Sequence, residues 1–179
     1  MNRYYHGLAG GIPFWEEQEV LDESLRILDS IFKLGGLYCR NSLNKFGVLY
    51  YNERPNYNGY DYISICTDNP TDDEFTGENF GLDSSFFRYV RTKIAIEFKS
   101  TIIEKCTLRE EPYKRLPGER QIYNFIDISN FYRILVGLED LKDKAINDIT
   151  KICEPFSIPV ITFQDAEYLD KKQKALCKR

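Results

Sequence analysis

The chain has 179 residues, of which 42% are hydrophobic and 15% aromatic, enough apolar side chains to fill the core of one globular domain. Its formal net charge is -4, so it has no overall positive field of the kind that draws proteins to nucleic acid by counterion release. No run approaches the roughly 20 apolar residues of a membrane-spanning helix, and the N-terminus lacks the apolar core of a signal peptide. Composition therefore predicts a soluble, cytoplasmic protein.

The first predicted elements are an aromatic strand over residues 3 to 8 and a helix over residues 16 to 34. A glycine-containing segment, residues 9 to 13, separates the two. In the helix, apolar residues recur at helical spacing between acidic and basic ones. Gly35-Gly36 is a typical stop signal for such a helix.

Several extended segments follow the helix. Residues 37 to 40 and 45 to 51 are predicted to be strands, and residues 60 to 66 alternate with the period of two that a strand requires. The acidic, aperiodic stretch 68 to 85 is predicted to be a surface loop. Between Tyr89 and Lys99 the alternating isoleucines and phenylalanine predict a central strand.

The second half of the chain continues this pattern. Residues 101 to 108 fit a helix or a strand equally well, whereas residues 119 to 125 and 133 to 138 are predicted to be strands joined by a tight corner at 127 to 130. A helix over 139 to 153 and a last strand over 158 to 163 complete the chain before a lysine-rich tail. The sequence therefore predicts one α+β domain, residues 1 to 179, with a mixed or antiparallel sheet and flanking helices.

The sequence gives little support for a metal site or a catalytic thiol. The chain has one histidine, His6, which excludes a His-rich metal site, and we expect no metal. An odd number of cysteines without C-x-x-C spacing is typical of reduced, structural thiols. These cysteines are Cys39, Cys66, Cys106, Cys153 and Cys177.

Three segments contain residues suited to chemistry. They are His6-Gly7 in the first strand, Tyr60-Asp61-Tyr62-Ile63-Ser64 in a middle strand, and Glu119 at the start of a later one. Each alone fits a structural role. Taken in order, they resemble the ADP-ribosyltransferase fold, in particular its diphtheria-toxin and poly-ADP-ribose-polymerase-like branch, whose first core strand carries a histidine followed by glycine.

The third segment, residues 118 to 136, resembles the glutamate strand, corner and following strand of DarT-like transferases. The likeness spans residues 3 to 137 and implies a split β-sheet core of the ADP-ribosyltransferase type. The sequence departs from the family where Ser64 stands in Tyr-Ile-Ser rather than in a Ser-Thr-Ser run. No glutamate stands two residues before Glu119, which disfavours toxin-type modification of arginine.

The resemblance implies NAD as the substrate. Cleaving the bond between nicotinamide and ribose builds positive charge on a sugar carbon, which a nearby carboxylate stabilises. Glu119 would supply that carboxylate, with His6 on a ribose hydroxyl and Tyr62 on the nicotinamide ring as further catalytic residues. The implied NAD-binding residues are His6, Gly7, Arg40, Tyr60, Tyr62 and Ser64.

Other functions remain open at this stage. They are a non-catalytic binding module of the same fold, an NAD glycohydrolase, an RNA 2′-phosphotransferase and a cysteine hydrolase that uses His6. Nucleotide-binding glycine loops and the Gly-x-Ser-x-Gly elbow are absent from the sequence. The acceptor, protein or nucleic acid, stays open, as do the oligomeric state and a role as toxin or effector.

Overall fold

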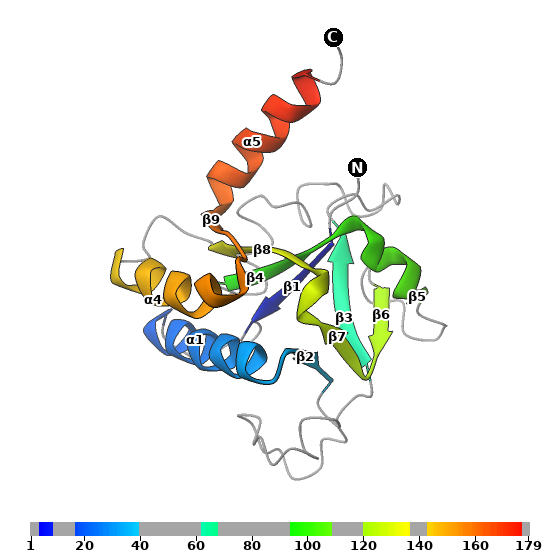
Figure 1. Ribbon diagram of the computed structural model, residues 1–179, viewed down its shortest axis with the longest axis horizontal. Helices are drawn as coiled ribbons and strands as arrows, with labels where there is room; N and C mark the ends of the chain where they lie inside the picture. Colours follow the sequence, from blue (N-terminus) through cyan, green and yellow to red (C-terminus); the bar gives the residue numbers. More distant parts are fainter. Residues whose placement is uncertain are drawn as a thin grey trace.

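A computed structural model describes residues 4–8, 17–39, 62–67, 94–108, 120–136 and 143–176. Within these ranges the chain forms helices and a mixed sheet, an α+β arrangement as predicted (Figure 1). Strand pairs in the main sheet are antiparallel except β8 with β9, which is parallel. No helix in the described part of the chain is both long and apolar enough to span a bilayer.

The main sheet has seven strands among the described residues. In spatial order they are β5 (Thr107–Leu108), β6 (Arg120–Tyr123), β3 (Tyr62–Thr67), β1 (Tyr4–Leu8), β4 (Ile94–Phe98), β8 (Phe131–Val136) and β9 (Val160–Thr162). A separate two-stranded sheet pairs β2 (Gly36–Tyr38) with β7 (Phe125–Asp127). The predicted central strand is confirmed, because all five residues of β4 are buried.

Two helices, α1 (Glu17–Lys33) and α4 (Asp143–Cys153), lie side by side over one face of the main sheet (Figure 1). Their apolar stripes pack on alternate residues of the central strands, as their helical periodicity predicts. Ile94, Ile96 and Ile134 are among the fully buried strand residues on this face. α1 ends where predicted, at Gly35, whose φ of +76° is a left-handed conformation that glycine adopts without strain.

Short 3-10 helices connect several strands. The ambiguous segment 101 to 108 forms η1 (Ser100–Lys105) followed by β5. The predicted corner is η2 (Ile128–Asn130), where the Asp127 carboxylate accepts a hydrogen bond from the Ser129 amide at 2.8 Å. That bond lowers the pKa of Asp127 below its usual value. After α4, η3 (Glu154–Phe156) leads to the last strand.

The C-terminal region differs from the prediction. The strand expected over residues 158 to 163 is only Val160–Thr162, and helix α5 (Phe163–Leu176) forms in the lysine-rich tail, for which no element was predicted. The Thr162 hydroxyl accepts from the Asp165 amide at 3.2 Å and donates to its carboxylate at 2.7 Å, which caps the first turn. The strand predicted at 45 to 51 and the loop predicted at 68 to 85 lie outside the described residues.

Candidate functional site

The three strands that carry the predicted motifs are neighbours in the sheet. β1, which contains His6 and Gly7, pairs with β3 through Tyr5 and Cys66. β3, which contains Tyr62 and Ser64, pairs with β6 through Ile65 and Arg120. Segments from the start, middle and later part of the sequence therefore lie side by side, in the order β6, β3, β1.

The pairing of β1 with β3 covers only Tyr4 with Thr67 and Tyr5 with Cys66. By contrast, β1 pairs with β4 along all five of its residues. Figure 1 shows β1 and β3 diverging from their shared end, and His6 and Gly7 follow directly after the last paired residue. The sheet thus consists of two blocks, a β1 block of β1, β4, β8 and β9 and a β3 block of β3, β6 and β5.

The side chains of His6 and Tyr62 leave the sheet on opposite faces. His6 pairs with Ile96, whose buried side chain belongs to the helix-covered core. Along β3, Ile63 and Ile65 point into that core, so the alternation of the strand turns Tyr62 to the other face. His6 and Tyr62 therefore do not line the same face of the sheet. Both side chains are half-buried.

Tyr62 is one half of an aromatic pair. It lies opposite Tyr123 of β6, with ring centroids 6.3 Å apart and ring planes at 74°, an edge-to-face contact. Tyr123 is 54% exposed. The sequence analysis selected Tyr62 and missed Tyr123. Tyr123 lies two residues after Gln121 in β6, so strand alternation places the two side chains on the same face.

Beyond Tyr123 the chain leaves the main sheet. Asn124 has a φ of +64°, a left-handed conformation, and its carbonyl accepts from the Cys39 amide at 2.8 Å. The next residues form β7, which pairs with β2. There the ring centroids of Tyr38 and Phe125 lie 4.3 Å apart. A second aromatic pair therefore flanks the bend on its other side.

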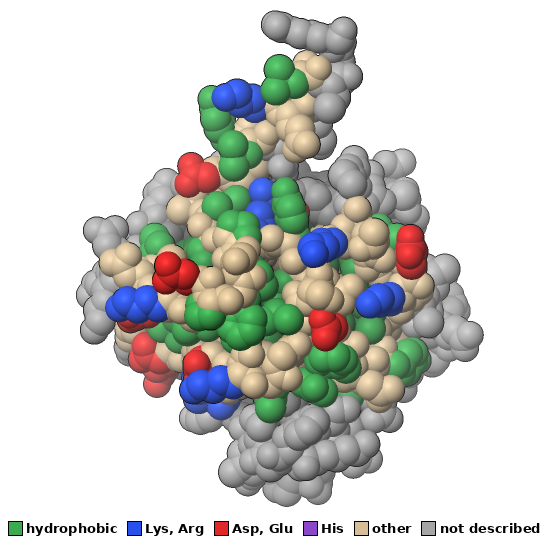
Figure 2. All heavy atoms as spheres, viewed as in Figure 1, with side chains coloured by type: hydrophobic (Ala, Val, Ile, Leu, Met, Phe, Trp, Pro, Cys, Tyr) green, Lys and Arg blue, Asp and Glu red, His purple; other side chains and the backbone are tan. Residues whose placement is uncertain are grey.

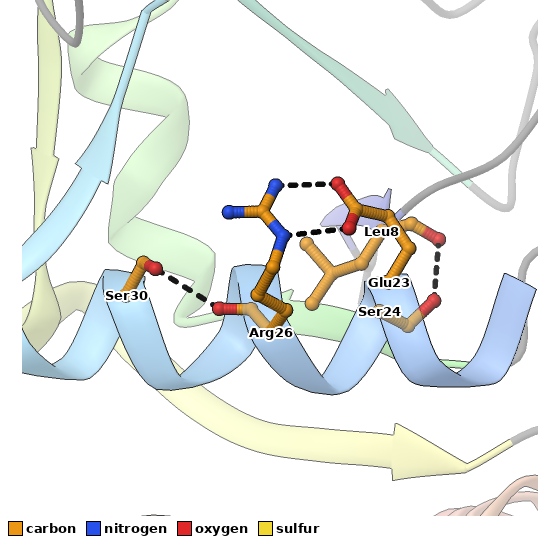
Figure 3. A network of polar contacts seen from close by, with 5 residues as sticks. All are labelled: Leu8, Glu23, Ser24, Arg26 and Ser30. Carbon is orange, nitrogen blue, oxygen red and sulfur yellow. Dashed lines mark hydrogen bonds and ion pairs between the residues drawn. The ribbon is translucent and has the colours of Figure 1, made fainter. Parts of the chain in front are cut away.

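Helix α1 holds β1 in place. The Ser24 hydroxyl, fully buried, donates to the Leu8 carbonyl at the end of β1 at 3.2 Å (Figure 3). One turn along, Arg26 binds both carboxylate oxygens of Glu23, and its carbonyl accepts from the Ser30 hydroxyl. The strand that carries His6 and Gly7 is thus anchored to the helix at its C-terminal end.

A buried ion pair lies on the face of the β1 block away from α1. Arg133 Nε of β8 donates to Glu97 Oε2 of β4 at 2.5 Å, and the two side chains are 5% and 4% exposed. Glu97 pairs across the ladder with Tyr5, which is also buried. The Arg133 guanidinium lies 5.1 Å from the ring centre of Tyr132. The sheet is therefore covered on both faces at β4.

Two of the thiols, those of Cys106 and Cys153, are poorly suited to nucleophilic chemistry. Burial raises the pKa of Cys106 to about 11, against a smaller lowering by Arg120, and raises the pKa of Cys153 to about 12. Both are therefore protonated at neutral pH. Among the described residues no group of three or more histidine, cysteine, aspartate and glutamate side chains could hold a metal ion.

The structure describes only some of the remaining predicted site residues. The backbone of Ser64 lies in β3, opposite Gln121. Glu119, Arg40 and Tyr60 lie outside the described residues, although Glu119 directly precedes Arg120, the first residue of β6. Neither a scan against protein-family models nor a search of curated proteins found a match to this chain.

Proposed function

We propose that the protein is an NAD-dependent ADP-ribosyltransferase, which cleaves the bond between nicotinamide and ribose and transfers ADP-ribose to a macromolecular acceptor. The main support is the adjacency of β6, β3 and β1 together with the divergence of β1 from β3 directly before His6 and Gly7. The three motifs that resemble the family in sequence thus belong to neighbouring strands.

In this proposal NAD binds between the diverging strands, so groups from both faces of the sheet reach it. Tyr62 stacks on the nicotinamide ring, while His6 contacts a ribose hydroxyl from the helix-covered side. The backbone of Gly7 pairs with the nicotinamide amide, and Arg40 binds the pyrophosphate.

Glu119 is the proposed catalytic carboxylate. As the glycosidic bond breaks, its carboxylate stabilises the positive charge that develops on the ribose. It then orients the acceptor nucleophile. No metal takes part.

The proposal is tested with NAD labelled in the nicotinamide ring. We expect the wild-type protein to release nicotinamide and Glu119→Gln to release it about 10²- to 10³-fold more slowly, the usual effect of removing one transition-state contact. Glu104→Gln, a change of the same chemistry at an exposed position of η1, is the matched control and should stay within about twofold of wild type.

Equal release by the wild-type protein and Glu119→Gln would contradict an enzymatic role for Glu119. A parallel assay with NAD labelled in the adenylate group separates transfer from hydrolysis. Label on protein or nucleic acid indicates a transferase, whereas free ADP-ribose alone indicates an NAD glycohydrolase.

The placement of His6 favours a second candidate, a non-catalytic binding module of the same fold. His6 shares its face with the helix-covered core and lies opposite Ile96, which is the position of a packing residue. Calorimetric titration with NAD distinguishes the two candidates. Binding without nicotinamide release supports the module, and turnover that depends on Glu119 excludes it.

A further inference from the structure

Helix α5 projects from the body of the protein and carries exposed apolar side chains (Figures 1 and 2). Its first turn is anchored by the Thr162 and Asp165 cap and by Ala166, which is fully buried. Farther along, Tyr168, Leu169 and Leu176 are 65%, 49% and 62% exposed. Exposed leucines on a projecting helix are a feature of interaction surfaces.

These residues form one stripe along the helix. Tyr168, Leu169, Lys172 and Leu176 follow the spacing i, i+1, i+4 and i+8, which places them on one side. Their exposed fractions show that the body of the protein leaves this stripe uncovered, although Ala166 of the same helix is fully buried. A helix of 14 residues is marginally stable in water by itself, and burial of its stripe against a partner would stabilise it.

The charges along α5 indicate what that partner is. On the side of the stripe, the acidic Asp165 lies in the first turn of the helix and the basic Lys172 lies two turns later. Two copies in antiparallel orientation place the acidic end of each stripe, at Asp165, against the basic part of the other, at Lys172. Parallel copies would place like charges together.

The exposed side chains fit the same arrangement. Asp165 and Lys172 are both exposed and lie seven residues apart, on the same side of the helix. In an antiparallel pair, Asp165 of one copy approaches Lys172 of the other, with Tyr168 and Leu169 between them.

We propose that α5 is a dimerisation helix that pairs antiparallel with α5 of a second copy, about a two-fold axis near Leu169. Self-complementarity of this kind is what a two-fold interface requires. The helix is about 21 Å long, so the pair is smaller than a standard protein interface and the dimer depends on concentration.

Sedimentation velocity of the full chain, from about 1 μM to about 1 mM, tests the proposal. We expect the wild-type mass to rise from monomer to dimer, and Leu169→Gln with Leu176→Gln to weaken the dimer more than about tenfold. Glutamine keeps helix propensity, which far-UV circular dichroism checks. Gln173→Glu, on the side of Ala166, is the control and should dimerise as wild type does. A monomer at every concentration, or a dimer that the double variant leaves intact, overturns the proposal.

Disulfide cross-linking tests the direction of the pair. In a Cys177→Ser background, a cysteine at position 169 lies near the axis and should cross-link two copies, whereas a cysteine at position 176 lies at the helix end and should not. Cross-linking through position 176 but not through position 169 would overturn the antiparallel arrangement.

Discussion

The two blocks of the sheet differ in how deeply their side chains are buried. In the β1 block, all of β4 and five of the six residues of β8 are buried, and the Glu97–Arg133 ion pair is enclosed with them. In the β3 block, Ile63, Ile65, Gln121 and Ile122 are buried as well, but Tyr62 is half-buried and β6 ends on the exposed Tyr123. The comparison indicates that β4 and β8 form the most completely buried part of the sheet, while the β3 block presents the rings of Tyr62 and Tyr123 at its surface.

The largest expected effect comes from breaking the ion pair of the β1 block. Glu97→Ala leaves the Arg133 charge buried without its carboxylate and should lower the free energy of unfolding by about 3–5 kcal/mol, measured by urea denaturation. Lys33→Ala, which removes the exposed pair with Asp29, is the control and should cost less than about 1 kcal/mol. Similar losses of unfolding free energy for the two variants would show that the buried Glu97–Arg133 pair contributes no more than the exposed Lys33–Asp29 pair.

An intermediate effect is expected at the start of β2, where Gly36 pairs with Asp127 at the end of β7. A Cβ atom at Gly36 would lie 2.4 Å from the Ile126 carbonyl oxygen and equally close to the Phe125 ring, so Gly36→Ala should cost about 1–3 kcal/mol. Thermal denaturation measures it. Gly35→Ala has open space around its Cβ and should cost roughly 1 kcal/mol, from its positive φ alone. A larger loss of stability for Gly35→Ala than for Gly36→Ala would contradict the close packing at Gly36.

The smallest effect on stability is expected in the β3 block itself. Tyr123→Ala removes a half-exposed ring and one edge-to-face contact, and should lower the free energy of unfolding by no more than about 1 kcal/mol. Phe131→Ala, in the buried β8, should cost about 3–5 kcal/mol in the same assay. A large loss at Tyr123 would mean that its ring supports the fold, and the contrast between the blocks would disappear.

Local sequence pattern was sufficient to predict several elements of the fold. α1, β4 and the corner at residues 127 to 130 follow the prediction, because each has a clear apolar pattern or turn residues. α5 was missed because its only buried described side chain is Ala166, so it lacks the apolar periodicity of a packed helix. Its stripe faces solvent instead.

The arrangement of the candidate site depends on pairings between distant strands. Alternation within β1 groups Tyr4, His6 and Leu8 on one side, but only the pairing with β4 shows that this side faces the helices. The divergence of β1 from β3 and the Glu97–Arg133 pair likewise join residues far apart in sequence. The order of the motif strands could not be read from local pattern.

The small sheet of β2 and β7 has a mechanical consequence. β2 continues from α1, which packs on the β1 block, and β7 continues from β6 of the β3 block through the bend at Asn124. The β2–β7 ladder therefore connects the β1 block to the β3 block at a second point. The first connection is the short pairing of β1 with β3. Widening the angle between β1 and β3 would strain the β2–β7 ladder, so we expect the spacing of the two strands to stay nearly fixed.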